Sequence, residues 1–198
     1  MQELRVIPVP LSGDVRHGDS LIDKFLDALK SRRVSLAKGD ILVVKHKIVS
    51  KAEGQLIRLD TIKASARSRA WARRYQLDAR VTELALKQSK RIIRRKNGVL
   101  ITETRHGFIC ANSGVDVSNV DGGEHALLLP EDPDRSAANL HRALKKRVRL
   151  SIPVIISDSF GRPWREGLTE VAIGVAGMKA IHDYRSRTDP HGYRLRVT

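Results

Sequence analysis

The chain has 198 residues, a length that suits one hydrophobic core, because domains typically hold about 100 to 200 residues. A hydrophobic fraction of 41% and a charged fraction of 30% are typical of a soluble globular protein, and no apolar run approaches the roughly 18 residues of a membrane span. The formal net charge of +15 favours an anionic partner such as nucleic acid, a nucleotide or a phosphorylated metabolite.

The basic residues concentrate in two runs, LKQSKRIIRRKNG and LHRALKKRVRL. Binders of single-stranded nucleic acid usually place aromatic rings among such charges, so that bases can stack on them. Neither run contains an aromatic residue, so we expect solvated helix faces here rather than a nucleic-acid partner. The N-terminus lacks the pattern of a signal peptide, and the single cysteine, Cys110, cannot form an internal disulfide. We therefore expect a cytoplasmic protein.

The first elements along the chain alternate between strand and helix. Residues 4–9 (LRVIPV) predict a strand. Residues 20–32 predict an amphipathic helix with Ser20 as its N-cap, because apolar side chains follow at helical spacing. Residues 40–50 (DILVVKHKIVS) predict a second strand with a buried front half.

Residues 62–96 predict two helices that break near residues 76–78. Asp78 can cap the second helix, and Asn97 with Gly98 offers a left-handed stop at its end. The basic residues before that stop would then meet the negative pole of the helix.

The remaining elements are mostly strands. Residues 98–104 and 107–113 predict a hairpin, residues 151–160 a buried strand, and residues 171–184 a strand that continues into less regular structure. The irregular alternation and the hairpin argue against a purely parallel sheet. We expect an α+β fold with a mixed sheet, in a single domain with lobes.

Two buried strands are predicted to end in an aspartate. Asp116 lies in the polar cluster that follows GFICANS, and Asp158 with Ser159 ends the run IIS. Carboxylate and hydroxyl oxygens suit hard cations such as Mg²⁺ or Mn²⁺, which bridge phosphates. Each aspartate alone also fits a turn or a cap.

A third candidate is Lys51, which the sequence places after a predicted strand and before Gly54. No Walker A or dinucleotide-binding glycine motif is present, so Lys51 would serve a phosphate as a point charge, or it is a solvated lysine before a turn. His46, His106 and His125 lack metal-ligand spacing.

Four segments resemble a known family: KIVSKAEG, GVLITETRHGFICANSGVDVSNV, LLLPEDPDRSA and SDSFGRPWREGLTEVAIGVAGMKAIHDYRSRTDPHG. They are similar, in this order, to the coenzyme F420:L-glutamate ligases, also called F420-0 gamma-glutamyl ligases. The resemblance implies the family's own two-lobed α+β fold and an intertwined homodimer. It also implies that residues 1–198 form a single ligase domain ending before the C-terminal segment of the family.

The implied reaction joins L-glutamate to the phospholactyl deazaflavin precursor of coenzyme F420, then adds further gamma-linked glutamates, with GTP as the energy source. The resemblance implies Mg²⁺ or Mn²⁺ as the metal, with K⁺ as a further candidate. Asp116, Asp158 and Ser159 would hold the metal. The residues implied to contact GTP are Ser12, Gly13, Asp14, Val15, His46, Lys51 and Asn119.

A carboxylate is a poor acyl donor at neutral pH, so the expected mechanism passes through an acyl phosphate that the glutamate amine then attacks. No residue of the sequence stands out as the base for that amine. A basic protein that binds RNA or a nucleotide without turnover is the alternative.

Overall fold

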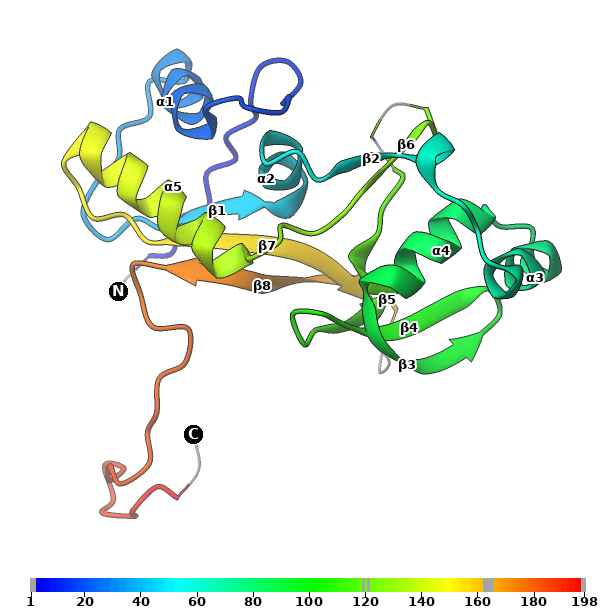
Figure 1. The fold of residues 1–198 in the computed structure, drawn as a ribbon. Coiled ribbons are helices and arrows are strands. Elements are labelled where there is room, and N and C mark those ends of the chain that lie inside the picture. The colour runs from blue at the N-terminus through cyan, green and yellow to red at the C-terminus, as the bar shows by residue number, and fades with distance from the viewer. Residues whose placement is uncertain (1–2, 119, 121, 162–165, 197–198) are drawn as a thin grey trace.

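The computed structural model describes residues 3–118, 120, 122–161 and 166–196 (Figure 1). Within these ranges the chain forms five α-helices, two short 3₁₀ turns and three small sheets. The expected α+β class is confirmed. The sheet that contains β1, β7 and β8 has one parallel and one antiparallel pair, so it is mixed, as predicted.

The central sheet contains β1 (Leu42–Lys45), β7 (Val154–Gly161) and β8 (Leu168–Ala176), in the order β1-β7-β8. β1 runs parallel to β7, whereas β7 and β8 are antiparallel. The helices α1 (Leu21–Ser31) and α5 (Pro133–Val148) lie along the same face of this sheet (Figure 1).

Local sequence explains where these two helices begin. The Ser20 hydroxyl accepts the Asp23 N–H at the start of α1, and the Asp132 carboxylate accepts the Arg135 N–H at the start of α5. Ile22 of α1 packs with two buried apolar residues, Leu144 of α5 and Ile152 before β7.

The close packing of α5 on β8 depends on Gly174. A Cβ atom at this position would lie 2.2 Å from the carbonyl oxygen of Pro133, the first residue of α5. No side chain fits in that space, so glycine permits the helix to start directly against the strand.

The other sheets lie beyond the end of the central sheet (Figure 1). β2 (Leu56–Arg58) pairs with β6 (His125–Leu127) in an antiparallel ribbon. The third sheet has the order β3-β4-β5, and α3 and α4 lie beside it. Its elements are α3 (Ala66–Tyr75), α4 (Ala79–Gln88), β3 (Ser89–Lys96), β4 (Val99–Thr104) and β5 (Ile109–Ala111).

Three predicted elements differ from the structure. Residues 4–9 form no strand; they are mostly exposed and no described strand pairs with them. The predicted strand 40–50 ends at Lys45 and continues as the helix α2 (His46–Ala52). Its buried residues His46, Val49 and Ser50 follow the i, i+3, i+4 spacing of a helix face, which explains the change of structure.

The basic run after α4 is a strand and not the end of a helix. α4 ends at Gln88, and residues 89–96 pair with β4. Asn97 (φ 48°) and Gly98 (φ 79°) do adopt left-handed conformations, but they form the two-residue turn of the β3–β4 hairpin. The predicted cap of α4 by Asp78 is confirmed, as is the β4–β5 hairpin.

The apolar core is divided among clusters. One surrounds the central sheet and contains Val44, Val49 and Ile156; another joins α4 to the β2–β6 ribbon through Leu84 and Leu128. Among the described residues, none of the helices is long and apolar enough to cross a bilayer.

Candidate functional site

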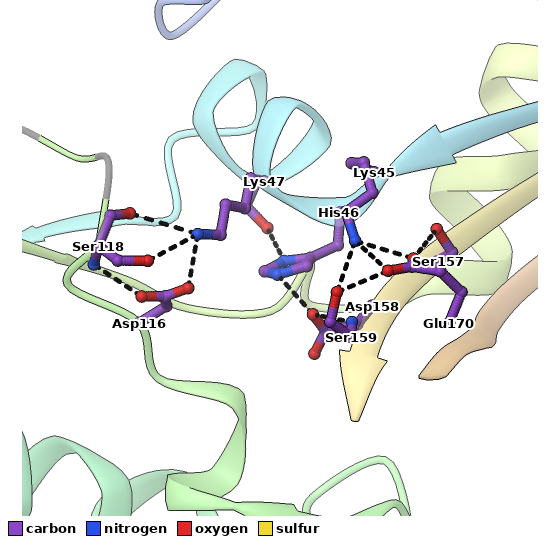
Figure 2. Close-up of polar contacts among 10 residues, drawn as sticks. Lys45, His46, Lys47, Asp116, Ser118, Ser157, Asp158, Ser159 and Glu170 are labelled. Atoms are coloured by element: carbon purple, nitrogen blue, oxygen red, sulfur yellow. Dashed lines mark hydrogen bonds and ion pairs between the residues drawn. The ribbon is translucent and has the colours of Figure 1, made fainter. Parts of the chain in front are cut away.

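Three consecutive basic residues stand where β1 ends and α2 begins, and each contacts a carboxylate from a different part of the chain (Figure 2). The three carboxylates come from β7, from β8 and from the loop before β6. The pairs are Lys45 with Glu170 (2.6 Å), His46 with Asp158 (3.1 Å) and Lys47 with Asp116 (2.6 Å). We call residues 45–47 with these three carboxylates the α2 junction. Successive Cα atoms lie about 3.8 Å apart, so the three carboxylates lie around one short segment.

The pair at the centre is buried. The His46 side chain is 2% exposed and that of Asp158 is 14% exposed, and their contact joins Nε2 to Oδ1. Nδ1 of His46 lies 3.4 Å from the Ser50 hydroxyl, one turn further along α2. The Ser159 N–H donates to the same Asp158 oxygen (2.7 Å), so the position of this carboxylate is fixed from both sides.

Asp116 is held by its backbone and by its side chain. Its N–H and carbonyl exchange hydrogen bonds with Leu127 (3.0 and 2.7 Å). Its carboxylate accepts the Ser118 N–H (2.7 Å) and contacts Lys47. Burial raises the pKa of Asp116, but the Lys47 ammonium and the hydrogen bonds from Ser118 outweigh burial, so its pKa lies below the ordinary value.

Glu170 forms the third polar centre, on β8. The Lys45 ammonium and the Ser159 hydroxyl (2.6 Å) are the main causes that lower its pKa to about 2, with a further hydrogen bond from Ser157 (2.8 Å). Lys45 Nζ also lies 2.9 Å from the Ser159 hydroxyl. Ser159 is therefore fixed between a cation and a carboxylate.

The polar cluster that precedes Asp116 has a structural role of its own. Asn112, Ser113 and Gly114 have φ values of 50°, 56° and 72°, a run of left-handed conformations that residues with a Cβ atom rarely adopt. The buried Ser113 hydroxyl donates to the Ala85 carbonyl of α4 (2.8 Å). A Cβ at Gly114 would lie 2.8 Å from the side chain of Leu129. These residues turn the chain sharply and so deliver Asp116 to α2.

The segment predicted to lie along GTP docks at the other end of α2. The Lys51 ammonium lies 3.4 Å from the Asp14 carboxylate, so the structure brings two of the predicted GTP residues together. Val15 is 7% exposed and packs in the core around the central sheet, which anchors the loop containing Ser12 and Gly13. Asn119 lies outside the described residues.

The donor atoms of the site suit a hard cation. Asp116, Asp158 and Ser159 offer two carboxylates and a hydroxyl, which are the oxygen ligands that Mg²⁺ and Mn²⁺ accept. Across residues 3–118, 120, 122–161 and 166–196, no three His, Cys, Asp or Glu side chains gather closely enough to form a metal site alone. The Asp116 carboxylate instead faces the Lys47 ammonium, and the Asp158 carboxylate faces the His46 ring.

Three residues of the site were missed in the sequence. Lys45 and Lys47 belong to a stretch that predicts a strand, Glu170 lies just before another, and nothing in their spacing marks them as functional. One usable signal was the run KHK at the end of an apolar strand, since three basic residues there need counter-charges. His46, predicted through the family resemblance, is placed on Asp158.

Cys110 is confirmed as a buried thiol. It lies on β5, and burial is the main cause that raises its pKa to about 11, with a further contribution from the charge of Asp158. That electrostatic contribution is consistent with β5 lying beside the β7 residue that contacts His46. The thiol stays protonated at neutral pH and is no nucleophile.

Comparison with known proteins shows which family this chain belongs to. The family model F420-0:Gamma-glutamyl ligase matches residues 12–198. The coenzyme F420:L-glutamate ligase of Methanopyrus kandleri is 44% identical over 195 residues, which cover 98% of this chain and 75% of that protein. The enzyme of the same name from Methanothermobacter thermautotrophicus is 44% identical over 181 residues, covering 91% of this chain and 71% of that protein.

A third relative, the coenzyme F420:L-glutamate ligase of Methanocaldococcus jannaschii, is 40% identical over 160 residues. These cover 81% of this chain and 64% of that protein. The span that matches the family model contains every residue of the α2 junction described above. The chain belongs to the F420-0:gamma-glutamyl ligase family.

Proposed function

We propose that this chain is a GTP-dependent ligase that joins L-glutamate to the deazaflavin precursor of coenzyme F420 and then extends the product with gamma-linked glutamates. The names of its relatives support the acceptor and the amino acid. The single structural observation that carries the proposal is the convergence of Asp116 and Asp158 on consecutive residues of α2. Two unrelated turns would have no reason to meet there.

In this proposal Asp116, Asp158 and Ser159 hold Mg²⁺ or Mn²⁺, with K⁺ as an additional cation. When bound, the metal supplies positive charge that neutralises the phosphates of GTP. The chain contributes oxygen ligands whose positions are already set, since each is hydrogen-bonded within the site. Ordered ligands reduce the entropy lost when the metal complex forms.

Lys51 and the segment 12–15 are assigned to GTP. Lys51 is 15% exposed and faces the exposed carboxylate of Asp14, so a phosphate that approaches α2 can replace Asp14 as its partner. His46 is buried against Asp158, and its side chain acts on GTP by orienting that carboxylate. Asn119 is also assigned to GTP, as the family resemblance implies.

The reaction has two steps. A carboxylate oxygen of the precursor attacks the γ-phosphorus of GTP; the new O–P bond forms as the bond to the β–γ bridging oxygen breaks, and GDP leaves. The glutamate amine then attacks the acyl carbon, inorganic phosphate leaves, and the amine nitrogen loses a proton to give the amide. The positive charge of Lys47 and Lys51 favours the anionic transition state of the first step.

Incubation of the full chain with GTP, Mn²⁺, precursor and L-glutamate tests the proposal by mass spectrometry. We expect precursor that carries one or more glutamyl residues, formed together with GDP and phosphate. ATP in place of GTP should give much less product. Tight binding of RNA or GTP without any glutamyl product would favour the basic binding protein and contradict the ligase.

A further inference from the structure

A second polar site lies away from α2, where α3 and α4 pack beside β3 and β4 (Figure 1). A cavity of about 270 Å³ opens there to the solvent. Its lining includes Arg67, Trp71, Arg74, Leu86, Arg95 and Leu100. Three arginines thus surround a cavity whose wall is largely apolar and aromatic.

The secondary structure explains why these side chains converge. Arg67, Trp71 and Arg74 follow the i, i+4, i+7 spacing of one helix face on α3. Arg95 of β3 is directly opposite Leu100 of β4 in the antiparallel register, so both side chains leave the sheet on the same face. The two elements present their arginines to the same space.

The three arginines have no acidic partner in the described part of the chain. Among the described residues, neither a carboxylate nor any other hydrogen-bond acceptor contacts Arg67 or Arg95, and Arg74 contacts only the ring of Tyr75 (5.6 Å to its centre). Two other basic residues of β3 differ, because Lys90 and Arg91 both pair with Glu103. Three positive charges without a counter-charge among the described residues therefore line the cavity.

Trp71 supplies the second observation. Its indole N–H is buried and has no acceptor anywhere in the described ranges. A buried donor without an acceptor costs about 1–3 kcal/mol. The ring of Trp71 also packs against Tyr75, with 4.5 Å between their centres, which orders an aromatic wall on α3.

We propose that this cavity binds a planar aromatic ring that carries a phosphate. The ring would lie against Trp71, Leu86 and Leu100, and the phosphate would accept hydrogen bonds from the guanidinium groups at the rim. Arginine suits this role because its planar fork donates two parallel bonds to phosphate oxygens and its face stacks on rings.

The size of the cavity favours one ring over a polymer. Small-molecule sites typically enclose about 300–1,000 Å³. At about 270 Å³ this cavity accepts a single ring system and leaves the rest of the ligand along the rim. A strand of nucleic acid requires a groove with successive stacking platforms, whereas the aromatic wall here is confined to Trp71 and Tyr75.

Two sources share this chemistry: the deazaflavin acceptor of the reaction proposed above, and a free guanine nucleotide. The acceptor as source rests on that proposed function. The cavity is connected to the α2 junction through β4, because the Leu100 N–H donates to the Asn112 side chain (3.4 Å), four residues before Asp116. An elongated acceptor could occupy the cavity with its ring and extend toward that loop.

Calorimetric titration of the full chain, without glutamate or metal, tests the inference. The probes are flavin mononucleotide (a tricyclic ring with a phosphate), riboflavin (the same ring without it), guanosine monophosphate and inorganic phosphate. Each is titrated into the parent chain, into Arg95→Gln and into Arg94→Gln. Arg94→Gln is the matched control. It makes the same charge change at the preceding residue of β3, and Arg94 does not line the cavity.

We expect flavin mononucleotide to bind, riboflavin to bind about tenfold more weakly, and Arg95→Gln to weaken flavin mononucleotide by about tenfold while Arg94→Gln has little effect. Tighter binding of flavin mononucleotide than of guanosine monophosphate identifies the acceptor as source, and the reverse identifies a nucleotide. Phosphate binding without a ring requirement, or binding unaffected by Arg95→Gln, would overturn the inference. A chain that binds these probes but makes no glutamyl product refutes the proposed function only.

Discussion

Lys47 lies 2.6 Å from Asp116, and this ion pair joins the first turn of α2 to the loop that leaves the β4–β5 hairpin. The residue before Asp116, Val115, belongs to the core cluster beneath α4, whereas Val49 of α2 belongs to the cluster around the central sheet. The pair therefore spans the boundary between two separately packed regions. A site at such a boundary can bring ligands from both regions to one substrate.

Replacing Lys47 by methionine should raise the pKa of Asp116, because burial of the carboxylate then acts without its counter-charge. The folded-state pKa of Asp116 is lowered, so its contribution to stability is present above the unfolded pKa of about 3.9 and is lost as the pH falls through the folded value. Lys47→Met should remove roughly 1 kcal/mol at pH 7. Carboxyl NMR titration and urea unfolding measure both effects. Lys63→Met, an exposed lysine without an ion pair, is the control, and equal effects would contradict the assignment.

Glu170→Gln should lower turnover by about 10–100-fold, the usual effect of removing a residue that orients a metal ligand. The variant loses the charge that holds Lys45 and weakens the acceptor for the Ser159 hydroxyl. The apparent Mn²⁺ affinity should fall by a similar factor, whereas a purely structural role would leave it unchanged. Asp27→Asn on the exposed face of α1 serves as the control for a lost carboxylate charge and should leave both measurements as in the parent.

Glu83 should make the α3–α4 region sensitive to acid. Hydrogen bonds from Ser65 and Ser68 are the main causes that lower its pKa to about 2. A lowered folded-state pKa means that its stabilisation is present above the unfolded value, near 4.5, and is lost between about pH 4.5 and 2. Glu83→Gln should cost about 1–2 kcal/mol at pH 7. Urea unfolding of parent and variant should converge toward pH 2, and a constant difference would rule out this account.

Gly54 and Gly107 provide a matched pair of substitutions. Both have positive φ (74° and 91°), so alanine at either position should cost about 1 kcal/mol. Only at Gly54 would the new Cβ meet a neighbour, at 2.9 Å from the ring of His17. Gly54→Ala should therefore displace the loop that carries Asp14 and lower the affinity for GTP, whereas Gly107→Ala should leave that affinity unchanged. Calorimetry with GTP measures this, and equal affinities would separate that loop from the nucleotide.

The sequence predicted the elements whose local signals and tertiary contacts agree. Ser20 and Asp78 cap helices as expected, because an N-cap depends on residues three positions apart or fewer. The run 89–96 was predicted wrongly as helix. Its conformation depends on pairing with β4, and intrinsic residue propensities carry no information about that pairing. Residues 46–50 show the opposite error, because they were predicted as strand and form the first turns of α2. The burial of His46 on one face of that helix is a tertiary contact.

Of the residues at the α2 junction, the sequence singled out Asp116, Asp158 and Ser159, and the family resemblance added His46. Asp116 and Asp158 stood at the ends of apolar runs, where a functional side chain is recognisable. Lys45, Lys47 and Glu170 were missed, because the ion pairs Lys45–Glu170 and Lys47–Asp116 join elements distant in the chain, and a single sequence does not reveal which elements meet. The resemblance implies that Asp116 and Asn119 serve the metal and the nucleotide, and the structure adds that Asn112, Ser113 and Gly114 before them form a backbone turn.

The central claim is that Asp116 and Asp158 serve one metal and phosphate site, and the most direct measurement compares turnover and Mn²⁺-dependent melting in Asp116→Asn, Asp158→Asn and the double variant. We expect each single change to abolish glutamyl transfer, the double change to add little, and Mn²⁺ with GTP to raise the melting temperature of the parent only. Without metal, the single variants should unfold at a temperature close to that of the parent. Retained turnover in either single variant, or the same Mn²⁺-dependent rise in all four proteins, would contradict the account.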